Sequence, residues 1–259
     1  MKNDIWNLRA KQRDILRNVL DPADEAGLKN RYIDIIHKYY LRRYFIRHDG
    51  GSTLDFGCGV GRISSWLAKF SRHVVGVDTS PEFIKKAKTL NKNRRISYYR
   101  GGLDILGSNR KFDRAISVWV LQHILTDREI EKTAGLLGNL LKRNGYFCLI
   151  EQVCRHNRYM RLPDTGEVYL VHRTMDEYTR IFSQNGFRLR RAVLMPETVW
   201  GFVYRVIRKN RLPRLSLKVL PLTVLFDIIF AWAVLKIKKM PATGRIDCLL
   251  LFKKSTDTK

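Results

Sequence analysis

The sequence predicts an α/β fold: a doubly wound, mostly parallel sheet with helices on both faces. Two observations predict it. Short apolar runs typical of buried strands alternate with helical patterns from about residue 50 onwards, which indicates successive βαβ units. The first such run, residues 53–56, leads into a glycine-rich turn and then a helix beginning near Arg62. The 259 residues are enough for one such domain with additions, or at most two small ones.

The glycine-rich turn at residues 57–61 follows the pattern G-x-G-x-G and is preceded by an acid, Asp55. A dinucleotide site requires G-x-G-x-x-G, with room for a pyrophosphate. Asp55 would repel a diphosphate but could accept hydrogen bonds from an ammonium group. Asp78 ends the next strand, where a βαβ unit binds ribose hydroxyls. The ligand should therefore carry a ribose and a cation without a diphosphate, as S-adenosylmethionine does. A glycine turn of another Rossmann-like protein is the alternative interpretation.

Residues 55–61 together with Asp78 resemble the class I S-adenosylmethionine-dependent methyltransferases. The resemblance covers about residues 50–195 and, loosely, residues 246–252. It implies a seven-stranded sheet whose last strand is antiparallel, and S-adenosylmethionine as the cofactor. The predicted cofactor-binding residues are Asp55, Gly57, Cys58, Gly59, Gly61, Asp78, Thr79, Asp104, Ser117 and Val118.

The chain before this turn predicts two helices. Residues 5–20 form a basic amphipathic pattern, and residues 21–24 break it. A second helical pattern runs over about residues 28–47. In the resembled family such a leading helix often closes over the cofactor, which Lys29 and Tyr32 could do, but a plain packing helix is the favoured interpretation.

Caps and turns divide the rest of the chain. A helix begins at residues 79–82, where Ser or Thr is the cap and Pro81 lies in the first turn. Residues 152–171 are loop-like, and a long loop at the ligand end of a sheet is usually a substrate loop. The predicted strands are residues 53–56, 73–77, 96–99, the strand beginning at 112, 146–150, 187–194 and 246–252; the remaining predicted helices are residues 127–141 and 174–184.

The positions after the third and fourth predicted strands give information about the cofactor and the acceptor. The family usually places an acid after the third strand to hold the adenine amino group, and here either Gly102 occupies that place or Asp104 follows two residues late. Contact with adenine and the capping of a turn both stay open for Asp104. Residues 117–120 read S-V-W-V, whereas methylases of exocyclic base amines typically carry [D/N]-P-P-[Y/F] there. This difference weighs against that chemistry.

The insertion before the last strand has a composition of its own. Residues 199–209 form a basic amphipathic helical pattern, residues 219–235 are nearly all apolar, and lysines follow. A single membrane span would separate the last strand from its sheet. We therefore predict peripheral contact of residues 199–239 with an anionic membrane, the alternative being a buried lid or dimer surface. The predicted division is an N-terminal helical cap at 1–48, a cofactor domain at 49–195, the insertion at 196–240, and the last strand and tail at 241–259.

Charge and cysteine content limit the kinds of partner and the cellular compartment that the protein can have. The net charge of +25 attracts nucleic acid, anionic lipid or an acidic substrate. The charge alone does not distinguish among these three kinds of partner. The four cysteines lack a C-x-x-C pair and the six histidines lack a zinc pattern, so we predict reduced thiols and no metal site. The first residues lack the apolar core of a signal peptide. We predict a cytoplasmic protein, peripheral on the inner face of a membrane; the oligomeric state is left open.

Methyl transfer requires in-line attack on the cofactor's methyl group, and a hydroxyl acceptor also needs a base. His123 is the first candidate because it follows the fourth strand, and His156 and Glu151 come next. For each of them a packing role is a strong alternative. Three arginines could bind an anionic acceptor, although solvated surface charges are favoured: Arg155, Arg158 and Arg173.

The first hypothesis for the function is O-methylation of a small or lipid-linked acceptor, of glycan or isoprenoid quinone type, at a membrane surface. The second is methylation of RNA or a ribosomal component, suggested by the charge. The third is a non-catalytic scaffold that keeps the fold. The apolar insertion favours the first over the second, because a nucleic-acid binder does not need it. The third is disfavoured because a scaffold has no need of Asp55 and Asp78.

Overall fold

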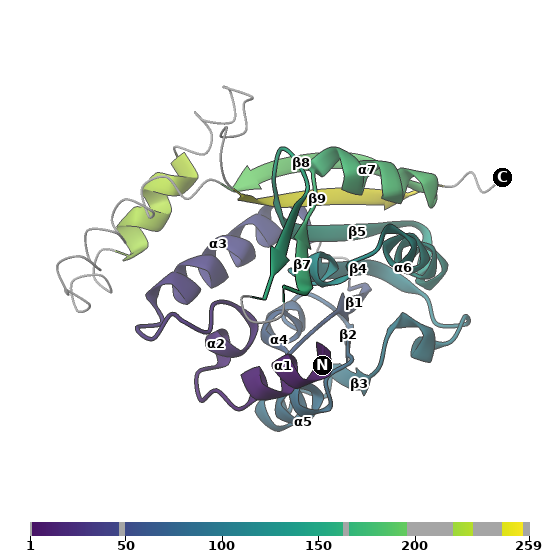
Figure 1. Cartoon of the computed structure of the whole chain (residues 1–259). Coiled ribbons are helices and arrows are strands. Elements are labelled where there is room, and N and C mark those ends of the chain that lie inside the picture. The colour runs from purple at the N-terminus through teal and green to yellow at the C-terminus, as the bar shows by residue number, and fades with distance from the viewer. Residues whose placement is uncertain (1, 47–49, 163–165, 196–219, 230–244, 256–259) are drawn as a thin grey trace.

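A computed structural model describes residues 2–46, 50–162, 166–195, 220–229 and 245–255. Its main sheet has seven strands in the order β3-β2-β1-β4-β5-β9-β8 (Figure 1). Strands β1 to β5 pair in parallel, and β9 is antiparallel to both β5 and β8. The strands are β1 (Ser52–Phe56), β2 (His73–Asp78), β3 (Ile96–Arg100), β4 (Phe112–Val118), β5 (Leu141–Val153), β8 (Phe187–Met195) and β9 (Ile246–Lys254). The predicted fold class and the antiparallel last strand are confirmed.

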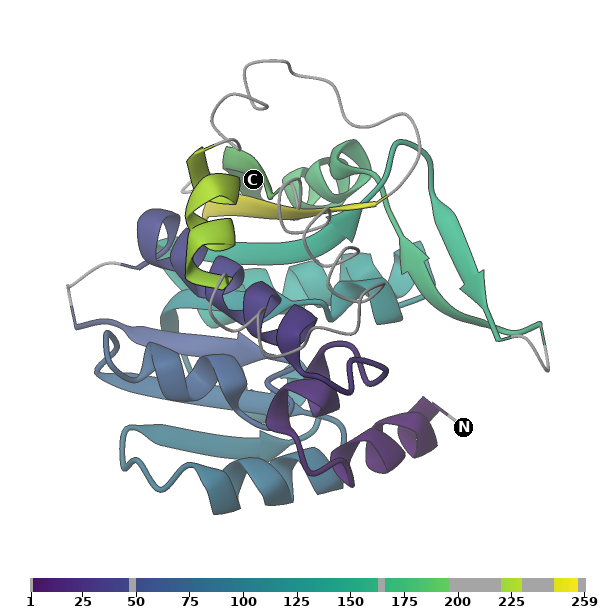
Figure 2. The same ribbon diagram turned by 90° about the vertical axis from the view of Figure 1, so that its left-hand side faces the viewer.

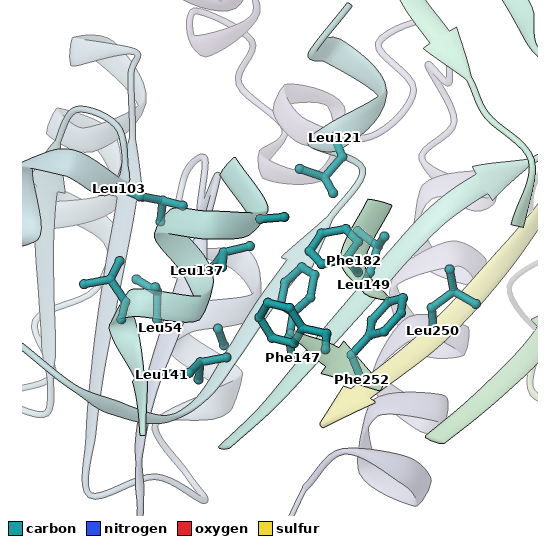
Figure 3. Packing of buried hydrophobic residues seen from close by; sticks show 14 of the residues in the cluster. Leu54, Leu103, Leu121, Leu137, Leu141, Phe147, Leu149, Phe182, Leu250 and Phe252 are labelled. Atoms are coloured by element: carbon teal, nitrogen blue, oxygen red, sulfur yellow. The ribbon is translucent and has the colours of Figure 1, made fainter. Parts of the chain in front are cut away.

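Helices cover both faces of this sheet, as the doubly wound prediction requires. One apolar cluster joins the sheet to α6 (Asp127–Leu140) and α7 (Met175–Gln184), and a second joins it to α3 (Leu28–Tyr44) and α4 (Arg62–Leu67). In the first cluster Phe147, Phe182 and Phe252 pack together (Figure 3). Helix α5 (Pro81–Leu90) packs against β3. The two clusters hold the strands of the sheet in fixed positions relative to one another. The candidate site lies at the carboxyl ends of the parallel strands.

The predicted N-terminal helix at residues 5–20 is wrong as a single element. The structure has α1 (Lys2–Ala10) and α2 (Ile15–Val19), separated by a turn. Asp14 causes the second start, because its side chain accepts hydrogen bonds from the backbone N–H groups of Leu16 and Arg17. The second predicted helix is confirmed as α3, which ends at Tyr44 rather than near residue 47.

The predicted loop at residues 152–171 is also corrected. Strand β5 continues to Val153, and β6 (Arg158–Arg161) pairs antiparallel with β7 (Val168–His172) as a separate two-stranded sheet. The residues of β6 are largely exposed, so the strand lacks the apolar alternation that marks a half-buried strand in a sequence. Strand β5 also begins earlier than predicted, with an irregularity in its pairing to β4. Short 3₁₀ turns follow β3 and β4 at η1 (Leu103–Leu106) and η2 (Leu121–His123).

Part of the insertion is described. Residues 220–229 are helical and lie beside α3 (Figure 2). The basic amphipathic helix predicted at 199–209 falls outside the described residues, as do residues 230–239. Within the described ranges, no helix is both long and apolar enough to cross a membrane.

Candidate functional site

The glycine-rich loop connects β1 to α4 at the carboxyl edge of the sheet. Its glycines Gly57, Gly59 and Gly61 all have positive φ, between 53° and 80°, which L-residues with side chains adopt at a cost. The backbone N–H groups of Gly57 and Cys58 donate to the carbonyl of Val77, at 2.9 and 3.0 Å, so β2 holds the loop in place. The loop is therefore a fixed piece of bare backbone that a ligand can approach closely.

Space as well as backbone angle requires glycine in this loop. A Cβ atom at Gly57 would collide with the side chain of Val120, and one at Gly61 would collide with the hydroxyl of Tyr98. A Cβ at Gly59 would lie 2.6 Å from Cγ1 of Val19. Neighbours from α2, from β3 and from the turn after β4 thus surround the loop.

Asp78 ends β2 directly beside this loop. Its Oδ2 accepts a hydrogen bond from the N–H of Gly59 and its Oδ1 accepts one from the N–H of Ser80, both at 2.9 Å. Ser80 is in turn the N-cap of α5. Burial raises the pKa of Asp78, while the two N–H donors act in the opposite direction. The carboxylate is half-buried, and its placement at the carboxyl end of β2 suits it to ribose hydroxyls.

Asp55 lies deeper. Its side chain is buried, and its Oδ2 accepts a hydrogen bond of 2.6 Å from Ser64 Oγ on α4. Burial raises the pKa of Asp55 to about 6, and the charge of Asp78 acts in the same direction. The structure therefore places both predicted acids against one loop, with Asp55 beneath α4 and Asp78 beside the loop.

The N-terminal segment covers this loop. Trp6 of α1 lies edge-on to His123, with ring centroids 4.7 Å apart, and also contacts Phe83. Asn7 Oδ1 accepts a hydrogen bond from Ser80 Oγ at 3.0 Å. Val19, at the end of α2, packs over Gly59. Closure over the site thus comes from α1 and α2, within the predicted N-terminal cap, whereas the sequence had suggested the following helix for this role.

The helix whose sequence suggested closure, α3, has other contacts. Lys29 pairs with Asp21 at 2.9 Å, and the Tyr32 hydroxyl donates to Asp227 at 2.8 Å. Most of its inward face packs in the second apolar cluster. It serves as a packing helix in this structure.

A strained turn follows β4. Trp119 has φ of 57°, which is uncommon for a bulky residue, and its N–H donates to the carbonyl of Ile150 at 2.9 Å. The next two N–H groups, of Val120 and Leu121, donate to Glu151 Oε1 at 2.8 and 2.6 Å. Burial raises the pKa of Glu151 to about 8. Glu151, predicted as a candidate base, holds this turn in shape.

The other predicted site residues are spread over the carboxyl edge. Asp104 in η1 is exposed, as is Thr79, whereas Cys58 and Ser117 are buried and Val118 is half-buried. His123 ends η2, with Nδ1 3.5 Å from the carbonyl oxygen of Tyr169. Arg155 and His156, just before β6, and Arg158, its first residue, are exposed.

Arg173 differs from the surface charge that its sequence suggested. It is 1% exposed and donates to the carbonyls of Ile124 and Leu125, at 3.0 and 3.1 Å. It also pairs with Asp127 and Glu177. It therefore holds the segment after η2 to the start of α7.

Sequence reasoning missed Ser64 and Trp119, and it suggested the helix at about residues 28–47 for closure in place of α1 and α2. Ser64 stands nine residues after Asp55 on a helix, and nothing in the pattern distinguishes it from a surface serine. The φ of Trp119 depends on partners in β5 and β9. A tertiary contact of this kind leaves no local signal.

Comparison with known proteins identifies the domain and the fold. The methyltransferase domain family matches residues 54–149. This part of the chain is a methyltransferase domain. The described residues have the class I S-adenosylmethionine-dependent methyltransferase fold. The chain superposes on a putative sarcosine dimethylglycine methyltransferase from Galdieria sulphuraria with a TM-score of 0.62 and 16% identity, covering 98% of each chain.

Relatives of the methyltransferase domain differ in their acceptors. Phosphoethanolamine N-methyltransferase 1 of Zea mays is 32% identical over 53% of this chain and 27% of its own length. Ubiquinone biosynthesis O-methyltransferase of Pelagibacter ubique is 32% identical over 46% of this chain and 50% of its own length. The chain thus spans half or less of the length of these two curated relatives.

Proposed function

We propose that this protein is an S-adenosylmethionine-dependent methyltransferase that methylates an oxygen of a small or lipid-linked acceptor at a membrane surface. The observation that carries the cofactor part is the loop of three glycines with positive φ between Asp55 and Asp78. It offers bare backbone, a carboxylate for ribose hydroxyls and a second acid nearby, without the spacing for a diphosphate.

The residues present fit this cofactor. Asp78 would bind the ribose, and the half-buried Val118 and buried Ser117 end β4 where the reacting methyl group would lie. The Ser117 hydroxyl is buried with no hydrogen-bond partner among the described residues, as expected of a group that binds a ligand. When bound, the cofactor supplies a methyl group on a sulfonium. The chain aligns the acceptor and excludes water from the reaction.

The membrane part of the proposal rests on the helix at residues 220–229. One side of it is buried against the rest of the protein, and Asp227 on that side accepts a hydrogen bond from Tyr32. The other side carries four large apolar side chains at helical spacing, which are 41–55% exposed: Leu222, Leu225, Phe226 and Ile229. An anchored helix with an outward apolar face suits partial insertion into a lipid interface.

Positive charge near this helix supports an anionic surface as its partner. Arg31 lies exposed on α3 close to Leu220 and Val224 of this helix, and the sequence continues with lysines at 236, 238 and 239. Each basic residue close to an anionic membrane contributes about 1 kcal/mol. Under this proposal the protein is cytoplasmic and peripheral, so that a lipid-linked acceptor presents its head group to the carboxyl edge of the sheet.

One experiment separates this proposal from its alternatives. The protein is incubated with methyl-tritiated S-adenosylmethionine and, in separate reactions, a total lipid extract, purified ribosomal subunits or buffer. We expect label in the lipid extract. Label in ribosomal RNA or protein would contradict the proposed acceptor and support the second hypothesis, methylation of RNA or a ribosomal component. No label in any reaction would favour a non-catalytic scaffold.

A further inference from the structure

A second polar cluster lies at the carboxyl edge of the sheet, apart from the glycine-rich loop. His37 of α3 is fully buried, and its Nε2 lies 3.0 Å from Asp247 Oδ2 at the start of β9. The other oxygen of Asp247 accepts a hydrogen bond from Trp119 Nε1 at 3.2 Å. The rings of His37 and Trp119 meet edge to face, with centroids 5.3 Å apart. Three segments far apart in the chain thus converge on one carboxylate.

This cluster adjoins the cofactor loop from two directions. Asp34, one turn before His37 on α3, pairs with Arg62 at 2.8 Å, and Arg62 is the first residue of α4 after the glycine-rich loop. Val120, directly after Trp119, packs over Gly57. The cluster therefore lies beside the end of β4, where an acceptor must approach the methyl group.

The two ring nitrogens of His37 have different surroundings. Nε2 faces the Asp247 carboxylate, which favours a proton on that nitrogen. Nδ1 is buried with no hydrogen-bond partner among the described residues. Burial lowers the pKa of His37, and Asp247 acts in the opposite direction. A neutral ring with Nε2–H on the carboxylate leaves the Nδ1 lone pair available.

Burying a histidine and a carboxylate together costs free energy that packing alone does not require. A histidine held by a carboxylate through one nitrogen, with the other nitrogen free, is the arrangement used to accept a proton during catalysis. The carboxylate fixes the ring and stabilises the imidazolium that forms.

We propose that His37 is the base of the methyl transfer and that Asp247 is its positioning residue; this rests on the proposed O-methyltransferase function. The acceptor oxygen forms a bond to the methyl carbon as the carbon–sulfur bond breaks, and that bond's electron pair stays on sulfur, which becomes neutral. The acceptor's hydroxyl proton moves to His37 Nδ1. Asp247 balances the positive charge of the imidazolium.

Trp119 controls access to this base. His37 is 0% exposed, and the half-buried indole packs against its ring. The proposal therefore requires the indole to move aside before an acceptor can reach the ring. Strained residues held by several partners are typical of sites where movement accompanies binding, and Trp119 has both the positive φ and the partners.

His123 is the competing base. Its Nδ1 lies near the carbonyl of Tyr169, and its ring contacts Trp6. A carbonyl can fix the ring but supplies no full negative charge to an imidazolium, whereas Asp247 does. The Asp247 carboxylate, 3.0 Å from His37 Nε2, therefore equips His37 for proton transfer.

The test uses the full-length protein and the lipid extract as the source of acceptor. The rate of label transfer from methyl-tritiated S-adenosylmethionine is measured from pH 5 to pH 9 for wild type, His37→Gln, Asp247→Asn and His123→Gln. His73→Gln, at the start of β2 away from the site, is the matched control. Calorimetry with S-adenosylhomocysteine checks that each variant is folded.

We expect His37→Gln to transfer label at least about 100-fold more slowly than wild type while binding S-adenosylhomocysteine equally well. In Asp247→Asn the acid limb of the pH profile should move to lower pH by about 1–3 units, because the pKa of His37 loses its supporting charge. Asp34 on α3 and Arg62 on α4 also face His37 and are unchanged in that variant. The acid limb of His123→Gln should stay at the wild-type pH.

A wild-type rate in His37→Gln would overturn the proposal, as would an acid limb that moves in His123→Gln and not in Asp247→Asn. If His37→Gln fails to fold, the pH profile of Asp247→Asn decides alone, and an unshifted limb overturns the proposal. A wild-type protein that binds S-adenosylhomocysteine but labels no lipid would instead refute the proposed acceptor.

Discussion

Asp55 and Asp78 flank the same loop but have different environments. Asp78 is half-buried and accepts two backbone hydrogen bonds, whereas Asp55 is buried and bonded to Ser64. Their presence was predictable, because an acid before a glycine-rich turn and an acid after the next strand are local features of sequence. Their burial was not, because it depends on α4 and the N-terminal helices.

The raised pKa of Asp55 predicts pH-dependent cofactor binding. A cationic ligand favours the ionised acid, so binding should release a proton and strengthen as the pH rises through about 6. We expect S-adenosylmethionine to bind about tenfold more weakly at pH 5 than at pH 7. Calorimetry in buffers of different ionisation enthalpy measures the proton release. Asp55→Asn should remove most of this dependence; a pH-independent wild-type affinity would contradict the assignment.

At the scale of elements, all seven strands of the main sheet were predicted from the sequence, whereas several of the connections between elements were predicted wrongly. The apolar runs of β1, β2 and β4 are long enough to stand out, and Ser80 and Pro81 mark the start of α5. The β6–β7 hairpin and the turn between α1 and α2 were missed because exposed strands and side-chain caps produce weak patterns. The shape of the turn after β4 depends on Glu151, which follows it by some thirty residues.

Glu151 gives a stability prediction for that turn. Glu151→Ala removes the acceptor for the N–H groups of Val120 and Leu121, at a cost of about 1–3 kcal/mol for each unsatisfied group. Glu151→Gln keeps an acceptor oxygen. Thermal unfolding at pH 6 should therefore show a much lower Tm for the alanine variant than for the glutamine variant. Equal Tm values would mean that these hydrogen bonds do not hold the turn.

The same carboxyl group predicts a pH effect on stability. Its folded-state pKa, about 8, lies above the ordinary value of 4.5, so the folded state binds the proton more tightly. The stabilisation is present at low pH and is lost as the pH rises from about 4.5 through about 8. Between pH 5 and pH 9 the Tm of wild type should fall more than that of Glu151→Gln. A parallel fall in both would contradict the raised pKa.

At the scale of the whole molecule, charge and the insertion distinguish this chain from a bare methyltransferase domain. The net charge of +25 was evident from composition, and the apolar character of residues 219–235 from the sequence. Which side of the helix at 220–229 faces outward could not be predicted, because its burial depends on α3 and on the Tyr32–Asp227 hydrogen bond. The acceptor contacts lie where the sequence carries no recognisable motif.

Membrane binding can be tested on that outward face. Flotation with vesicles of phosphatidylcholine and phosphatidylglycerol should recover the wild-type protein, and phosphatidylcholine alone or high salt should recover less. Replacing Leu222 and Leu225 by Ser should weaken binding about tenfold or more, because both side chains are about half exposed and would insert. Leu90→Ser, an exposed leucine on α5, is the matched control. Equal recovery of all three proteins would remove the membrane proposal.

The most direct test of the cofactor site is calorimetry of the wild-type protein and Asp78→Asn with S-adenosylhomocysteine. Glu82→Gln, an exposed carboxylate four residues further on, serves as the control. We predict one-site binding by wild type and control, and an affinity at least about tenfold lower in Asp78→Asn, since it loses a charged acceptor for ribose hydroxyls. No binding by the wild-type protein, or equal affinities for all three proteins, would contradict the account.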